Sequence, residues 1–568
     1  MGQGVAPGGL VRFLPIVGWL PGYPARWLRF DLVAGLTAAA VVIPQAMAYA
    51  AIAGLPVQVG LYTALVPMLA YALLGASRPL SVSTTSTIAM LTATALATVA
   101  QSSNPLQYMV PAATLAFLTG AFLLLAAILR LGFLANFISL PVLTGFKAGV
   151  GVLILVGQLG KVLGIPVPKG PFFPTILALG RGLGEIHWLT LMVALGTLAI
   201  LLFLPRRTSR LPAPLVAVAA AILVSALFQL GARGMALVGP VPPGLPAFEP
   251  PDLSLVRGLW PGALGIALMS FTESIAAART FAKHGDPPCD PNQELLALGT
   301  ANLGGSFFQA MPAGGGTSQT AVNSKAGARS QLAAIATAGV VIVTLLFLAP
   351  VVSLMPEATL GALVLVAAAG LIKVQEFRAI AGIRRIEFWL AIIAFAGVVL
   401  LGTLEGILLA VLISVLSLFY QANHPPVYAL GRKPGTDVFR PLSPEHPDDE
   451  TFPGLLMART EGRLHFASAP RAGDQLRQLL RTASPQVLVA DLSAVPDIEY
   501  TALRMLVELE KELREQGISL WLAALNPEPL AVIQRSALGK LLGRERMFFN
   551  LEQAVEAYQQ RQRGKDLS

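Results

Sequence analysis

Two stretches of the chain combine a proline start with dense hydroxyl side chains, and both lie in otherwise apolar sequence. The first runs Pro-Leu-Ser-Val-Ser-Thr-Thr-Ser-Thr over residues 79–87, and the second runs Pro-Ala-Gly-Gly-Gly-Thr-Ser-Gln-Thr over residues 312–320. Each pattern predicts an irregular segment that turns into a helix partway along. A helix that begins inside a membrane presents unpaired backbone N–H groups and the positive end of its dipole. Two such ends aimed at one spot form an anion site without any formal cation.

The alternative is that these small and hydroxyl-bearing residues only let helices pack closely, as they do in many membrane proteins. For a single hydroxyl this alternative is the better interpretation. Two dense clusters in matching positions of the two halves of the chain favour the anion site.

A carboxylate, Glu273, lies within the apolar stretch 259–281. A charged group at membrane depth is costly and is a functional candidate by default. Burial favours its protonated form, so we expect a proton acceptor that titrates during transport. The alternative is a neutral, hydrogen-bonded structural glutamate. We expect no second acid at a comparable depth in the central segments.

Gln45 and Tyr49 are one helical turn apart and follow Pro44, which disturbs a helix. Either side chain alone is consistent with packing. Together, beside a broken helix, they are predicted to line a cavity.

The composition indicates that most of the chain faces lipid. Hydrophobic residues make up 55% of it, charged residues 12%, and the mean hydropathy is +0.68. Apolar runs of about 20 residues, the length that crosses a bilayer, fill the region from Asp31 to Gln421. The predicted spans are 32–53, 59–76, 80–101, 110–130, 134–162, 187–205, 211–230, 259–281, 290–308, 313–330, 331–350, 356–375, 386–402 and 404–421.

These spans form two groups of seven. With a cytoplasmic N-terminus, most Lys and Arg of the short loops fall inside, among them Arg78, Arg130 and Arg279. An odd group used twice gives copies of opposite orientation, which is the inverted-repeat arrangement of secondary transporters. The even total of spans places the C-terminal tail in the cytoplasm as well.

Several classes are excluded. One cysteine, Cys289, allows neither an internal disulfide framework nor a cysteine metal cluster, and we expect no metal. The net charge of +9 resides in short loops between apolar runs, which argues against nucleic acid. The N-terminus lacks the pattern of a cleaved signal peptide. Without a Gly-rich phosphate loop, an ATP-driven pump is not indicated, and we expect neither enzymatic activity nor a cofactor.

The chain resembles the SulP family of sulfate permeases and solute carrier 26-like anion transporters. The resemblance is carried by the following motifs: IPQAMAYA (43–50), AGLP (53–56), GLY (60–62), GASRPLSV (75–82), PVLTGF (141–146), LGTANLGGSF (298–307), TAVN (320–323) and AGAR (326–329). It implies a seven-plus-seven inverted repeat with a core and a gate domain, a homodimer, and elevator-like movement of the core.

By motif, the resemblance also assigns the site. The anion-contacting positions it implies are Gln45, Tyr49, Thr84, Thr85, Thr317, Ser318 and Gln319. Glu273 takes the position of an acid that family members use for cation or proton coupling.

Two departures from the family pattern bear on the substrate. Gln319 stands where many members have arginine, so a preference for divalent sulfate is not implied. Ser83 and Thr84 replace a common Gly-Pro and add hydroxyl donors. Ala277 stands where sodium-coupled relatives have a hydroxyl, which favours protons over sodium.

The tail alternates strand and helix patterns. Segments 486–492 and 518–523 are predicted strands, and 501–514 and 529–541 are predicted helices, giving a small mixed sheet with helices on one face. It is similar to the STAS domain of SulP transporters. Thr501 stands where related anti-sigma antagonists carry a phosphorylatable serine, and the alternative is that it caps the helix.

The predicted protein is thus an all-α membrane protein with a soluble α/β domain. Its expected parts are a cytoplasmic N-terminus (1–30), a transport domain (31–421), a linker (422–451) and a STAS-like domain (452–562). We expect a proton-coupled anion symporter in a bacterial inner membrane, with lipid around it and a cytoplasmic protein as a candidate partner of the tail. The alternatives are an uncoupled exchanger or chloride/bicarbonate conductor, and a membrane-anchored anion sensor that signals through the tail.

Overall fold

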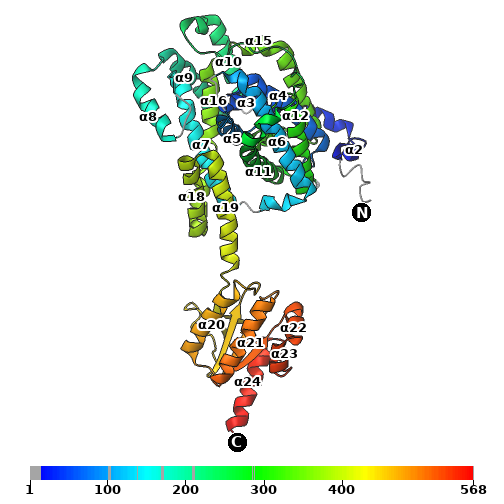
Figure 1. Ribbon diagram of the computed structural model, residues 1–568, viewed down its shortest axis with the longest axis vertical. Helices are drawn as coiled ribbons and strands as arrows, with labels where there is room; N and C mark the ends of the chain where they lie inside the picture. Colours follow the sequence, from blue (N-terminus) through cyan, green and yellow to red (C-terminus); the bar gives the residue numbers. More distant parts are fainter. Residues whose placement is uncertain are drawn as a thin grey trace. The chain divides into compact units, whose positions relative to one another are not determined.

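The computed structural model describes residues 14–99, 104–136, 139–167, 172–207, 212–283, 286 and 288–566. The chain divides into two units, 1–414 and 415–568, and each is described by itself (Figure 1). Residues 1–13 of the predicted N-terminal segment lie outside the described residues, as do the ends 100–101 and 211 of two predicted spans and residues 137–138 within a third.

The first unit is helical and contains two bundles. The core domain is built from α3 (Ala25–Ala53), α4 (Val57–Leu74), α5 (Ser86–Ala97), α6 (Met109–Ile128), α11 (Val256–Phe281), α12 (Pro291–Ser306), α13 (Thr317–Lys325) and α14 (Leu332–Val343), which continues through a π-helical turn into α15 (Ala349–Val352). The gate domain is built from α7 (Leu140–Leu163), α9 (Trp188–Arg207), α10 (Ala213–Phe228), α16 (Glu357–Ala369), α18 (Arg385–Leu401) and the part of α19 (Thr403–Ala422) that precedes residue 415. A helix therefore occupies each predicted span.

Within the described residues, eight helices have the length and apolar composition needed to cross a membrane. The exceptions matter for function. α5 has 12 residues and α13 has 9, so they extend only about 18 Å and 14 Å, roughly half of a bilayer core. The prediction of broken helices is confirmed at both places.

Among the described residues of the first unit, three α-helices were absent from the predicted set: α2 (Pro15–Trp19), α8 (Phe172–Gly182) and α17 (Val374–Ile383). On α8 the large apolar side chains Phe173, Ile176 and Leu177 are exposed. Helices α8 and α17 are short and amphipathic, which is the pattern of an interfacial helix and not of a spanning one.

The second unit is a six-stranded sheet with helices on both faces. Its strands lie in the order β4 (Phe439–Pro441), β3 (Val427–Arg432), β5 (Leu455–Thr460), β6 (Val487–Asp491), β7 (Ser519–Ala523) and β8 (Met547–Phe548). Strands β5 to β8 are parallel, and β3 pairs antiparallel to both β4 and β5. The helices are α20 (Ala469–Ala483), α21 (Tyr500–Glu515), α22 (Pro527–Gln534), α23 (Ala537–Leu542) and α24 (Leu551–Asp566).

Two predictions for this unit were wrong. The segment 422–451 is not simply a linker, because β3 and β4 lie in it and belong to the sheet. Helices do not cover one face only. Alternate residues of a strand point to opposite faces of the sheet. Leu456 and Leu488 share a core with α20 and α21 on one face. Met457 and Val489, on the other face, pack with α24.

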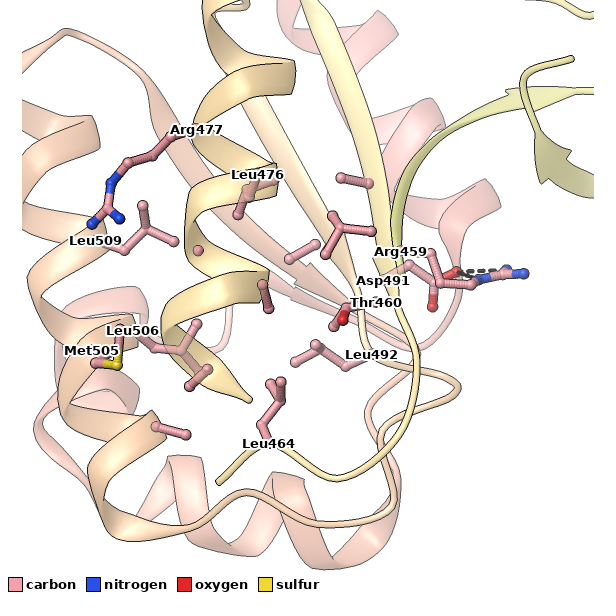
Figure 2. Close-up of a pocket in the computed structure, with 17 residues that line it drawn as sticks. Arg459, Thr460, Leu464, Leu476, Arg477, Asp491, Leu492, Met505, Leu506 and Leu509 are labelled. Carbon is pink, nitrogen blue, oxygen red and sulfur yellow. Dashed lines mark hydrogen bonds and ion pairs between the residues drawn. The ribbon is translucent and has the colours of Figure 1, made fainter. Parts of the chain in front are cut away.

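A small apolar cavity of about 70 Å³ lies between α20, α21 and the sheet (Figure 2). In Figure 2 Leu476 of α20 and Leu506 and Leu509 of α21 border it. Its charged lining residues are already paired: Arg459 with Asp491 at 2.6 Å, and Arg477 with Asp474 and Glu512. The cavity therefore offers no free charge to a polar ligand.

Candidate anion-binding site

The two predicted irregular segments meet in the middle of the core domain. Each contributes a two-residue strand, β1 (Val82–Ser83) and β2 (Gly314–Gly315), and the strands pair antiparallel. All four residues are buried. Directly after each strand a half-helix begins, α5 after β1 and α13 after β2. The structure therefore brings together two hydroxyl clusters that lie far apart in the sequence.

The glycines of β2 are required by a close approach to α11. A Cβ on Gly315 would lie 3.0 Å from the Cα of Ser274, and one on Gly314 would lie 2.8 Å from the Ser270 hydroxyl. These two serines also fix the strand: Ser274 Oγ accepts the Gly315 N–H at 2.7 Å, and Ser270 Oγ donates to the Ala313 carbonyl at 2.7 Å. Helix α11 thus holds the start of the second half-helix in place.

The helix N-termini differ in how they are capped. Thr85 is the N-cap of α5, and its hydroxyl accepts the Ile88 N–H. Gly316 is the N-cap of α13 and makes no side-chain cap. Because a helix leaves its first N–H groups unpaired, α13 presents donors that no capping side chain takes. Thr317 and Ser318, in the first turn of α13, are exposed.

Gln319 connects the two half-helices. Its Oε1 accepts from Ser83 Oγ at 2.7 Å, and its Nε2 donates to the Thr84 carbonyl at 3.4 Å. Its side chain is only 1% exposed. Both ends of the Gln319 amide therefore bond to residues 83–84, between β1 and the start of α5, and Ser83 is a residue near the site that the predicted set lacked.

Glu273 belongs to α11, and its side chain lies beside the start of α5. Its Oε2 accepts from Thr85 Oγ1 at 3.0 Å, and its Oε1 accepts from Thr87 Oγ1 at 3.2 Å. The carboxylate also has a charged partner that the sequence analysis did not identify: Lys147 Nζ of α7 lies 3.3 Å from Oε1. Lys147 had no role in the sequence interpretation because nothing local links the two residues.

Tyr49 of α3 stands beside both half-helices, and Gln45 lies one turn earlier on the same helix. Helix α3 packs against α5 and α13. The buried Tyr49 side chain is in hydrogen-bonding reach of Ser86 and Ser318, one in the first turn of each half-helix. Gln45 Oε1 and Thr84 Oγ1 are buried without a hydrogen-bond partner. A buried polar atom left unpaired is costly, so these two atoms are suited to a ligand or water.

Helix α12 carries another buried acid, Glu294, in its first turn. Its burial is by protein, so the expectation of no second acid at the membrane depth of Glu273 stays a prediction. Glu294 has no exposed surface and accepts from the Tyr71 hydroxyl and from the N–H groups of Ala76 and Ser77. Nearby, Gln331 Nε2 donates to carbonyls of the same loop. These contacts fix the turn that leads into β1, which is a structural role.

Thr501 lies in the second unit, apart from these residues. The N-cap of α21 is Glu499, which makes no side-chain cap, and Thr501 is the second residue of the helix. The alternative that Thr501 caps the helix was therefore wrong. Its side chain is exposed.

A bundle of apolar helices with two half-helices, one of which begins beside a buried carboxylate, is the arrangement of a membrane carrier for anions. The chain belongs to the Sulfate permease family of anion transporters, whose sequence model matches residues 28–394. The STAS domain model matches residues 446–554.

Curated relatives agree. The chain is 37% identical over 562 residues to a probable sulfate transporter of Mycobacterium tuberculosis, covering 97% of this chain and 100% of that protein. It is 29% identical to high affinity sulfate transporter 1 of Stylosanthes hamata, covering 97% of this chain and 86% of the relative.

Solved structures share the fold. The murine solute carrier 26 family member A9 anion transporter, in its inward-facing state, superposes with a TM-score of 0.86 at 23% identity, covering 98% of this chain and 96% of that one. The transmembrane domain of the cyanobacterial bicarbonate transporter BicA gives a TM-score of 0.59 at 23% identity, covering 69% of this chain and 98% of that one.

Proposed function

We propose that the protein is a proton-coupled secondary active transporter of small anions of the sulfate, bicarbonate or dicarboxylate class. The observation that carries the proposal is the buried Glu273 carboxylate, which accepts a hydrogen bond from the N-cap Thr85 of the half-helix α5. The same helix end that favours the Glu273 carboxylate favours a substrate anion. Binding of a proton to Glu273 and binding of the anion beside it are therefore coupled.

The core domain is proposed to slide as a body along the gate domain. The helices of each domain pack mainly with one another, and the broken helices belong entirely to the core. A rigid core carries its site across the membrane in the elevator manner, with two copies of the chain joined as a homodimer. The proposed location is a bacterial inner membrane with both termini in the cytoplasm, following the bias of loop lysines and arginines.

The proposed contacts of the substrate anion are uncharged side chains, those of Gln45, Tyr49, Thr84, Thr317 and Ser318. Relatives are described as sulfate transporters, and one fold neighbour as a bicarbonate transporter. Gln319 brings no charge and already bonds to Ser83. Hydrogen-bonding donors with little fixed charge suit a monovalent or protonated oxyanion as well as sulfate. Competition by sulfate, bicarbonate, chloride and a dicarboxylate against one labelled anion ranks the affinities of the protein for these four anions.

Flux into proteoliposomes tests the coupling. We expect an inward proton gradient to drive uphill uptake of the labelled anion and a protonophore to abolish it. Uptake that is indifferent to the gradient would instead identify an uncoupled exchanger or a chloride/bicarbonate conductor. Binding without any flux would identify a membrane-anchored anion sensor signalling through its STAS domain.

Thr501 is a proposed regulatory position, at which phosphorylation would recruit or release a cytoplasmic protein. A phosphate in the first turn of α21 is favoured by the helix dipole. Phosphate incorporation by a cytoplasmic extract into the protein, but not into its Thr501→Val variant, is the expected result. Equal incorporation into both removes the proposal.

A further inference from the structure

An ion pair joins the two domains of the first unit at the anion site. Lys147 belongs to α7 of the gate domain and Glu273 to α11 of the core domain, with 3.3 Å between Nζ and Oε1. The Lys147 side chain keeps 22% of its surface exposed, whereas Glu273 keeps 6%. The ammonium group is thus more accessible to solvent than the carboxylate.

The sequence around Lys147 directs it towards the core domain. Gly145 and Gly149, one turn apart, pack against α18: a Cβ on Gly145 would overlap the Ala391 carbonyl, and one on Gly149 would lie 2.8 Å from the Val398 Cβ. Residue 147 is two positions from each glycine, so it lies about 200° around the helix from both. The face that holds Lys147 is therefore opposite the face buried on α18.

The groups that hold the Glu273 carboxylate are those that an incoming anion needs. Helix α5 contributes the uncharged hydroxyls of Thr85 and Thr87, and α7 contributes Lys147. Helix α3 contributes Tyr49, a buried titratable group that also interacts with Glu273. The carboxylate thus acts as an internal anion at the start of α5. Once it is protonated, Lys147 loses its counter-charge in a site of low dielectric, which is costly until another anion takes its place.

We propose that Lys147 is the cationic member of the anion site, for which the Glu273 carboxylate and the substrate anion compete. The proposal deepens the proposed function and rests on it. Lys147 supplies the positive charge that Gln319 lacks, and it does so from the gate domain instead of from α13. The proton goes to the Glu273 carboxylate and the substrate oxyanion goes to the Lys147 ammonium, so the two bind together and each raises the affinity for the other.

Equilibrium binding of labelled sulfate and labelled succinate to the purified full-length protein tests the proposal, in acidic and in neutral buffer. For the wild type we expect tighter binding in acid, by about 5- to 150-fold. Glu273→Gln should bind tightly in both buffers, because its Lys147 is always available. Lys147→Gln should bind about 10- to 100-fold more weakly than wild type in acid, since it loses a charged hydrogen bond.

Three further variants separate charge from folding. Lys147→Arg keeps the charge and should retain most of the binding. Lys147→Gln/Glu273→Gln leaves no unpaired charge behind and should still bind as weakly as Lys147→Gln alone. Lys161→Gln, on the same helix 14 residues further along, is the matched control and should bind like the wild type. Tight binding by the double variant would overturn the proposal for Lys147. If the wild type itself shows no proton-driven uptake, the proposed function fails instead, irrespective of the Lys147 variants.

Discussion

The Glu273→Gln protein is expected to bind its anion and yet to accumulate none of it under an inward proton gradient. Glutamine keeps the shape of the carboxyl group, and its single oxygen can accept a hydrogen bond from Thr85 or from Thr87, which bond to different oxygens of the glutamate, but it cannot exchange a proton. The proton gradient can then no longer drive transport of the anion. We expect gradient-driven uptake to fall to that of protein-free vesicles, while exchange of labelled for unlabelled anion between the two sides persists.

The measurement is uptake into proteoliposomes with and without the gradient, followed by counterflow of the same labelled anion. Glu405→Gln is the matched control, because Glu405 is an exposed carboxylate of α19 in the gate domain. It should retain both activities. Concentrative uptake by Glu273→Gln at the wild-type rate would contradict the role of Glu273. Loss of counterflow together with uptake would show that the substitution damages the site and not only the coupling.

The half-helices were predictable because their signal is local. Proline, glycine and consecutive hydroxyl residues break a membrane helix wherever they occur, and the structure places β1 and β2 at the stretches 79–87 and 312–320. The pairing of Gln319 with Ser83 could not be predicted in the same way. It depends on the register in which two distant strands pair, Val82 with Gly315 and Ser83 with Gly314.

The charge balance of the site was the main failure of the sequence interpretation. Hydropathy identifies Glu273 as an acid within an apolar span, but it gives no information about which basic residue of another span approaches it. Lys147 reaches Glu273 only because α7 presents its glycine face to α18. Glu294 was missed for the opposite reason: it lies in the first turn of α12, where an acid is ordinarily a solvated, dipole-stabilised residue, and here the loop from Ala76 to Ser77 covers it.

In the STAS unit, too, the elements that depend on distant partners could not be predicted from the sequence. The repeated strand–helix pattern identified β6, α21 and β7. The antiparallel strand β3 was not recognised, because one short strand next to a charged loop resembles a linker until its partner β5 is known. Met457 and Val489 point to the face of the sheet that α24 covers, and their neighbours along each strand point to the other face. Because both faces are buried, each strand is a continuous apolar run, and its sequence does not show which residues belong to which face.

Substitution of Gly60 by alanine is expected to disable the transporter from a position outside the anion site. Helices α3 and α4 touch at Gly60, where an added Cβ would overlap the carbonyl group of Ala46. Both partners are backbone, so no side-chain rotation relieves the overlap and the helices must separate. Overpacking of this kind costs about 1–3 kcal/mol, and more where the backbone cannot shift.

The displacement would reach the anion site directly, because Ala46 follows Gln45 and lies one turn before Tyr49 on α3. We expect Gly60→Ala to unfold at a lower temperature in detergent and to lose most of its transport in proteoliposomes at equal protein incorporation. Gly157→Ala is the matched control: Gly157 lies in α7, and an added Cβ there meets nothing within 4 Å. Unchanged melting and transport of Gly60→Ala would mean that α3 can move away from α4 without disturbing Tyr49, and would contradict the prediction that this helix contact holds the anion site in place.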